Sequence, residues 1–280
     1  MKLFLFALML VSLDAVADWS PPPNPDPQAI LRSAQDVSAR ASQTFRWLPN
    51  TVSDQEKADA TAQLAWFYDH ADAIDSSLSA VRESFALSAW QKLGEVYPPA
   101  LTQLIAVRDD RVARVHETSG AANAFLDAAS INRYLNDDDS TVDLFLWLDQ
   151  TDGRIARRVY ATAEPALVRT HHYALCGKYL DADRALQSAQ RSFEAMKKVP
   201  ERLPAFVSVL GVPTVSDVAD KGFSNQAAMI VALLAVNGDS AHAQDISKRA
   251  ITTYDSPQFE DALQNALNGT VPEPWPPSDD

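Results

Sequence analysis

The sequence predicts an all-α protein, and three observations carry this prediction. Apolar residues at helical spacing run almost without interruption between the two ends of the chain, whereas the alternating pattern of a half-buried strand is scarce. Only 8 of the 280 residues are glycine and 46% are hydrophobic, a composition that suits packed helices. A helix-ending turn also recurs along the chain. We therefore expect antiparallel helical hairpins stacked as an irregular α-solenoid.

The recurring turn has the same chemistry in each of its copies. An apolar pair precedes Asn or Asp, then any residue, then Asp, at residues 134–138, 179–183 and 235–239. Asn and Asp tolerate the left-handed backbone that ends a helix, and the later Asp or a Ser can cap the next helix. The copies begin 45 and 56 residues apart, so the period is irregular. Chance reuse of a common turn is the alternative explanation.

The first helices are predicted from their capping residues. Asp26 before Pro27 begins a helix that we expect to run to about Trp47. Ser53 and Glu56 form a capping box for the second helix. A third helix is expected over residues 73–97, before two prolines, with one buried stripe: Ile74, Leu78, Val81, Phe85 and Trp90.

The remaining helices follow from the same signals. We expect them over residues 100–116, 120–135, 140–150, 154–180 and 183–198, with Pro165 kinking or splitting the fourth. A short apolar helix is expected over 203–212, and a Ser- and Asp-rich connection leads to a hairpin over 225–254. Ser256 and Pro257 begin a last helix that ends at Leu267.

The segment 173–200 is predicted to be a helical hairpin, and its letters fall near the pattern W-x2-L-G-x2-Y…A-x3-F…P. The residues in step are Tyr173, Cys176, Gly177, Leu180, Ala189 and Phe193, with Pro200 one residue early. The chain thus resembles degenerate tetratricopeptide-repeat (TPR-like) proteins over at most residues 120–255. This resemblance implies a scaffold or adaptor function. Gly177 is expected to let two helices approach closely.

Residues 1–17 are predicted to be a secretory signal peptide, because Lys2 precedes an apolar run and Ala15-Val16-Ala17 forms a small-residue cleavage site. A proline-rich tail is expected over 18–27, an N-terminal helical region over 28–118, TPR-like hairpins over 119–268 and an acidic, proline-rich tail over 269–280. We expect a periplasmic or secreted bacterial protein with no membrane insertion after cleavage. The net charge of −13 disfavours nucleic acid as a partner.

The sequence predicts no catalytic, cofactor or metal site. It contains no HExxH, GxSxG, GxGxxG or Walker motif, and the adjacent His171 and His172 cannot share one metal. The single cysteine, Cys176, is expected to be buried and inert. Glu83-Ser84 resembles the catalytic letter pair of lytic transglycosylases, which are built on helical solenoids. The rest of that family's pattern is absent, and no catalytic role is assigned to Glu83.

The expected function is therefore binding of a protein or peptide partner by a non-enzymatic scaffold or adaptor. Arg154, Arg157 and Arg158 are the candidate partner-binding residues, because three arginines near a helix N-terminus oppose the helix dipole and need another explanation. One alternative is a periplasmic immunity or inhibitor protein that blocks a cationic toxin or hydrolase. Another is a peptidoglycan-acting enzyme on a helical solenoid.

Overall fold

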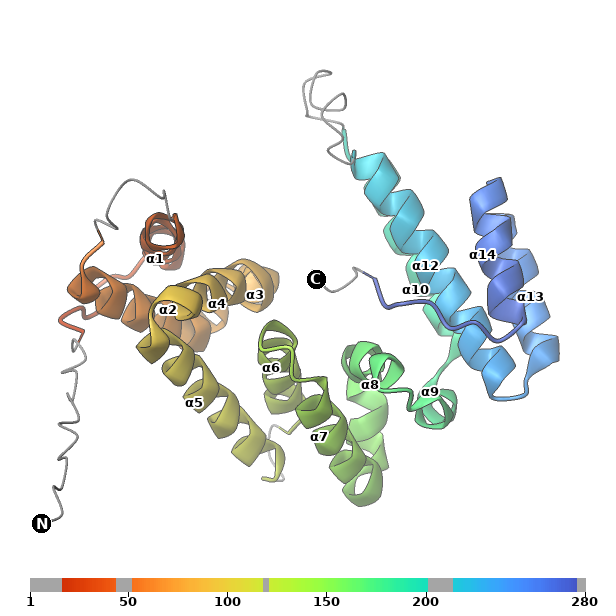
Figure 1. Cartoon of the computed structure of the whole chain (residues 1–280), viewed down its shortest axis with the longest axis horizontal. Helices are drawn as coiled ribbons and strands as arrows, with labels where there is room; N and C mark the ends of the chain where they lie inside the picture. The colour runs from red at the N-terminus through yellow and green to blue at the C-terminus, as the bar shows by residue number, and fades with distance from the viewer. Residues whose placement is uncertain (1–16, 44–51, 118–120, 201–213, 276–280) are drawn as a thin grey trace, which may run out of the picture. The chain divides into compact units, whose positions relative to one another are not determined.

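The computed structural model describes residues 17–43, 52–117, 121–200 and 214–275. Every regular element in these ranges is a helix, so the predicted all-α class is confirmed (Figure 1). The chain divides into two compact units, Met1–Asp137 and Asp138–Asp280. This division comes later than the boundary predicted at residue 118, because helix α6 packs on α5 in the first unit.

The first unit is built from a series of helices around one apolar core. They are α1 (Pro27–Ser42), α2 (Asp54–Ile74), the 3-10 helix η1 (Ser76–Leu78), α3 (Ser79–Val81), the π-helix η2 (Arg82–Ala86), α4 (Leu87–Val96), α5 (Pro98–Val115) and α6 (Ala121–Tyr134). Its centre holds Phe67, Tyr68 and Trp90, each at most 1% exposed. The Trp90 indole donates to the Ala100 carbonyl at 2.8 Å, which fixes α4 against α5.

The second unit contains the helices α7 (Asp138–Thr151), α8 (Gly153–Arg169), α9 (Tyr173–Tyr179), α10 (Ala182–Lys197), α12 (Val215–Val236), α13 (Ser240–Ile251) and α14 (Pro257–Leu267). It packs α7 against α8 and α8 against α9, and its last four helices surround a separate core. Helix α12 is the centre of this arrangement, since α10, α13 and α14 all pack on it. Phe193, Phe223 and Phe259 meet at the middle of the core.

Most of the predicted helix starts are confirmed. Asp26 caps α1, Ser53 and Glu56 form the capping box of α2, and Ser256 caps α14. In two of the recurring turns the chain takes a left-handed backbone, at Asn136 (φ 54°) and Gly238 (φ 86°). Asp181 and Asp239 then cap α10 and α13 through their side chains.

The third predicted helix is wrong in its start and in its stripe. Helix α2 ends at Ile74, and Asp75 caps a new start. The 3-10 turn η1 and the π-turn η2 then interrupt the 3.6-residue period between Ile74 and Phe85. Leu78 and Trp90 are buried as expected, whereas Ile74 and Phe85 are 52% and 64% exposed.

Other boundaries also differ. Helix α1 ends at Ser42, and Trp47 lies outside the described residues. The helix predicted over residues 154–180 is divided into α8 and α9 by a turn at 170–172, and Pro165 lies inside α8. His171 and His172 therefore lie in this turn, with His171 at φ 62°. The expected Ser- and Asp-rich connection is the first part of α12. The predicted helix over 203–212 falls outside the described residues.

The segment 173–200 does not form the expected packed pair. Helix α9 is only 7 residues long and takes α8 and α12 as its main neighbours, while α10 packs chiefly on α12. Neighbouring helices thus pack together in a way compatible with a helical repeat, but this segment is not one repeat unit.

Both proline-rich tails pack on their own units where they are described. Trp19 contacts Trp66 edge to face, with ring centroids 6.3 Å apart. The chain after α14 runs back along α12, where the Asn225 side-chain amide donates to the Glu273 carbonyl at 2.8 Å. None of the helices in the described ranges has the length and apolar character to span a bilayer.

Candidate functional site

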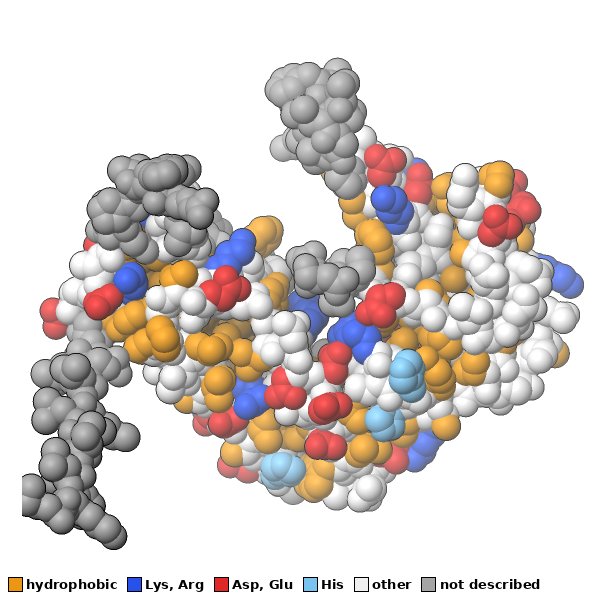
Figure 2. Space-filling view, in the orientation of Figure 1, with side chains coloured by type: hydrophobic (Ala, Val, Ile, Leu, Met, Phe, Trp, Pro, Cys, Tyr) orange, Lys and Arg blue, Asp and Glu red, His pale blue; other side chains and the backbone are white. Residues whose placement is uncertain are grey.

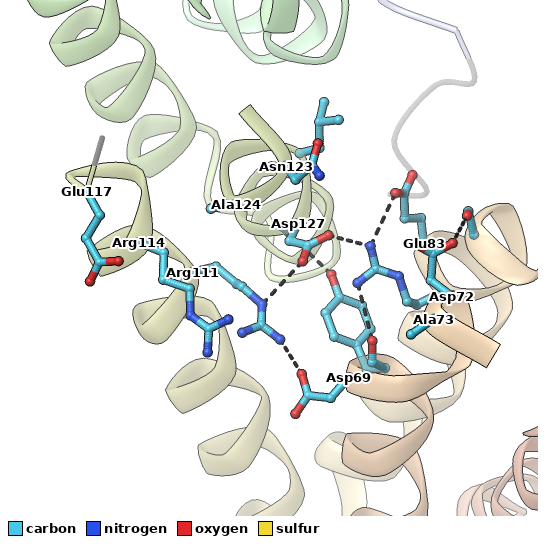
Figure 3. Close-up of a pocket in the computed structure, with 14 residues that line it drawn as sticks. Asp69, Asp72, Ala73, Glu83, Arg111, Arg114, Glu117, Asn123, Ala124 and Asp127 are labelled. Carbon is cyan, nitrogen blue, oxygen red and sulfur yellow. Dashed lines mark hydrogen bonds and ion pairs between the residues drawn. The ribbon is translucent and has the colours of Figure 1, made fainter. Parts of the chain in front are cut away.

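A concave site with converging polar groups lies in the first unit, between α2, η2, α5 and α6 (Figure 3). Its volume is about 720 Å³, within the usual range for ligand sites. Charged side chains dominate its lining: Asp69, Asp72, Glu83, Glu117 and Asp127, together with Arg82, Arg111 and Arg114. We call it the Asp127 pocket.

Asp127 on α6 is the centre of the charge network. It accepts a hydrogen bond from Arg82 Nη2 at 2.5 Å and pairs with Arg111 Nε at 3.2 Å. The three side chains are only 15%, 11% and 9% exposed, respectively. Because desolvated charges need close partners, this carboxylate is what allows two guanidinium groups to be buried side by side.

Arg82 is held on several sides. Its Nη1 donates to the Tyr68 carbonyl at 3.3 Å, and its guanidinium lies over the Tyr68 ring at 4.5 Å from the centroid. The Tyr68 hydroxyl donates to the Asp127 carbonyl at 3.3 Å, and burial raises the pKa of that hydroxyl. The α2, η2 and α6 walls are therefore tied together by specific polar contacts.

Arg111 closes the network on the α5 side. It pairs with Asp69 on α2 and, at 2.5 Å, with Asp110 beside it. Figure 3 shows Arg111 between Asp69 and Asp127. The positive charge of both buried arginines is thus balanced inside the protein, and neither is left as an open anion site.

Two carboxyl groups at the pocket, Asp72 and Glu117, have no cationic partner among the described residues. The Ser79 hydroxyl donates a hydrogen bond to the Asp72 carboxylate. Glu83 is 39% exposed and lies 3.7 Å from Arg82 Nη2. Burial raises the pKa of Glu83, an effect that Arg82 opposes. The pocket therefore presents an excess of negative charge to the space it encloses.

The π-helix explains why the sequence did not predict this pocket. A π-turn widens the helix locally, and such turns are frequent at functional sites. Here it places Arg82 and Glu83, consecutive residues, at the same cavity. The sequence signal was the charged pair within an expected apolar stripe, and its partner Asp127 lies 45 residues away.

The predicted partner-binding arginines lie elsewhere, on α8 of the second unit. Arg154 is 94% exposed and lies 3.5 Å from the capping Asp152. The Arg157 guanidinium lies 5.6 Å from the Tyr179 ring centroid, and Arg158 is exposed. All three are accessible on one helix, but none lines the Asp127 pocket. Charged side chains of both signs are interspersed in the view of Figure 2.

Among the described residues, no three His, Cys, Asp or Glu side chains gather as a metal site requires. The chain was compared with protein-family models, with curated proteins and with solved structures, and nothing matches it in any of the three.

Proposed function

We propose that this chain is a non-enzymatic binding protein whose Asp127 pocket receives a basic side chain of a protein or peptide partner. The observation that carries the proposal is the internal pairing of Arg82 and Arg111, which leaves Asp72 and Glu117 without a cationic partner among the described residues. A lysine or arginine entering the pocket would find the Asp72 carboxylate held by the Ser79 hydroxyl and the exposed Glu117 carboxylate at the edge.

The charge of the whole chain supports the same class of partner. A net charge of −13 accelerates encounter with a cationic protein. We propose that the protein is exported to the bacterial periplasm and acts there as a TPR-like scaffold or adaptor. In a variant of this proposal, the cationic partner is a toxin or hydrolase, and the chain is its inhibitor.

Site-specific photo-crosslinking in intact cells tests the binding surface. Two otherwise identical variants each carry one photoreactive amino acid. It replaces Asn123, an exposed residue at the pocket, in the first variant and Arg158 on α8 in the second. A partner captured at Asn123 supports the Asp127 pocket. Capture only at Arg158 would move the binding surface to the predicted arginines, and capture at neither position would contradict both surfaces.

Affinity for the captured partner then tests the charge argument. Asp72→Asn and Glu117→Gln should each weaken binding several-fold, and more strongly at low salt, because exposed charges are screened by ions. Asp36→Asn, at an exposed carboxylate on α1 that does not line the pocket, is the matched control. Equal effects of all three substitutions would indicate general attraction rather than this pocket.

One observation favours a second candidate function, a peptidoglycan-acting enzyme. Glu83 lines a polar cavity and has a pKa raised by burial, as a general acid requires. In this candidate Glu83 protonates the leaving oxygen of a glycosidic bond. Release of soluble muropeptides from purified peptidoglycan by the wild type, but not by Glu83→Gln, would favour the enzyme over the binding protein.

A further inference from the structure

A second cavity, of about 300 Å³, lies within the second unit, where α8, α10, α12 and the C-terminal segment meet. Its polar groups include Glu164 on α8, Ser188 and Ser192 on α10, and Asn225 on α12. Trp275 forms part of its wall. The proposed partner pocket does not involve any of these residues.

Glu164 is a carboxyl group without a counter-ion. In the part of the chain that the structure describes, no Lys, Arg or His side chain forms an ion pair with it. It lies in the cavity wall and is partly buried. Behind it, the buried Tyr160 hydroxyl interacts with Glu164 and Cys176 and brings no positive charge. Buried charges in proteins are normally paired, so Glu164 needs a cation from outside if it is to be ionised in this cavity.

The backbone adds a second acceptor at the same place. Pro165 lies inside α8 and has no N–H to donate to the Ala161 carbonyl, as an ordinary residue four positions later would. Ala161 itself lines the cavity beside Glu164. The helix thus brings a carbonyl that lacks its usual helical donor next to an unpaired carboxyl group.

The facing walls complete an acceptor-rich, half-apolar site. The Asn225 side-chain amide is committed to Glu273, which leaves its oxygen available as an acceptor. Met229 and Ile230 provide apolar surface next to it. The Trp275 indole lies over Gly222, where an added Cβ would be 3.3 Å from its Nε1. Trp275 and Glu164 thus line one cavity, and an aromatic ring together with a carboxylate is a combination that favours cations.

We propose that this cavity binds a short aliphatic primary amine, with the Glu164 carboxylate as counter-ion of the ammonium group and the Trp275 indole as its aromatic wall. An ammonium group carries three N–H donors, which match the carboxylate, the Ala161 carbonyl and the side-chain acceptors. The alkyl chain lies against Met229 and Ile230. The small volume excludes larger ligands.

The protonation of Glu164 gives the binding a definite pH dependence. Burial raises the pKa of Glu164, so the ammonium group must compete with a proton for it. Burial, with a smaller contribution from the nearby Glu164, raises the pKa of the Tyr160 hydroxyl. The same two causes raise the pKa of the Cys176 thiol to about 12. Both groups therefore stay neutral. The α10 and α12 walls offer Ser and amide side chains, and the Glu273 side chain on the C-terminal segment is exposed. Affinity should therefore rise with pH as Glu164 ionises.

Isothermal titration calorimetry of the full chain with n-butylamine, and with 1-butanol as the neutral control, tests the proposal. We expect the amine to bind at least tenfold more tightly than the alcohol at pH 8. The affinity for the amine should be lower at pH 5.5. Glu164→Gln should weaken it at least tenfold and Trp275→Ala several-fold. Glu194→Gln, at an exposed carboxylate outside the cavity, should leave it unchanged.

Two results would overturn the proposal: equal binding of amine and alcohol, or no binding of the amine to the wild type. Loss of binding through misfolding is separable, because Glu164→Gln replaces a partly buried acid with a neutral amide and should keep or raise the melting temperature. A Glu164→Gln variant that melts as the wild type yet binds the amine equally well would also contradict it.

Discussion

Gly177 on α9 lies directly against the side chain of Asn237 at the end of α12. A Cβ at Gly177 would lie 2.4 Å from the Asn237 Cγ, closer than two carbon atoms can approach. The Asn237 amide donates to the Tyr173 carbonyl at 2.9 Å and to the Leu233 carbonyl at 2.7 Å. The expected close approach of two helices at Gly177 is thus confirmed, although its partner is α12 rather than α10.

The substitution Gly177→Ala should therefore lower the free energy of unfolding. Alanine gains about 1 kcal/mol over glycine inside a helix, but the methyl group displaces Asn237 and breaks its two hydrogen bonds. We expect a net loss of about 1 kcal/mol or more, measured by urea unfolding. In the double variant Gly177→Ala/Asn237→Ala the clash disappears, and part of the stability should return.

Gly153→Ala is the matched control, because its nearest neighbour is the Tyr179 hydroxyl at 3.7 Å, an ordinary contact. It should leave stability unchanged or slightly raised. If Gly177→Ala behaves like Gly153→Ala, the α9–α12 contact is not as tight as the structure places it.

Asp127→Asn should be among the most destabilising changes in the first unit. It leaves Arg82 and Arg111 buried without their shared carboxylate, and removing one partner of a buried ion pair costs about 3–5 kcal/mol. Asp36→Asn, at an exposed pair with Arg40, should cost about 0.5 kcal/mol or less. Comparing their urea midpoints checks the prediction, and similar midpoints would contradict a structural role for the Asp127 network.

The stability of the first unit should respond to Glu83 in a pH-dependent way. Burial raises the pKa of Glu83 in the folded protein, so the folded state binds its proton more tightly than the unfolded state does. Ionisation of Glu83 therefore costs stability as the pH rises above the ordinary value for glutamate. Glu83→Gln should raise the melting temperature at pH 7.5.

At pH 4 the same substitution should have a smaller effect, because Glu83 is then mostly protonated in both states. Melting of the wild type and Glu83→Gln at the two pH values is the measurement. A substitution that stabilises equally at both values would point to packing rather than to the charge.

Asp59 should stabilise the N-terminus that the predicted cleavage after Ala17 would create. Its Oδ1 accepts the backbone N–H groups of Asp18 at 2.8 Å and Trp19 at 3.1 Å. If the signal peptide is cleaved after Ala17, the Asp18 nitrogen becomes a charged α-amino group beside this carboxylate. Exposed ion pairs contribute about 0.2–1 kcal/mol, and Asp59→Asn should remove this contribution.

The measurement is the melting temperature of Asp59→Asn in the chain that begins at Asp18, with mass spectrometry of the exported protein to locate its first residue. Asp54→Asn, at a more exposed carboxylate in the same helix, is the control. A first residue other than Asp18 would contradict the predicted cleavage, and an effect no larger than that of Asp54→Asn would contradict the terminal ion pair.

The sequence was sufficient for features that neighbouring residues decide. Capping by Asp26, Ser53 and Ser256 depends on side chains reaching backbone N–H groups two or three residues away. The burial of Cys176 and of α13 residues such as Ile246 follows from helical spacing. The all-α class is the sum of such local signals.

Only the tertiary structure decided the rest, because contacts between helices depend on which faces meet, and apolar burial has no direction of its own. The pairing of Arg82 with Asp127 and of Arg111 with Asp69, residues 45 and 42 positions apart, requires α2, η2, α5 and α6 to pack together first. The π-turn that brings Arg82 and Glu83 to one cavity interrupts the periodicity from which the apolar stripe of this segment was predicted. The neighbours of α9 were likewise settled by the fit of Gly177 against Asn237, a contact over 60 positions that no local pattern encodes.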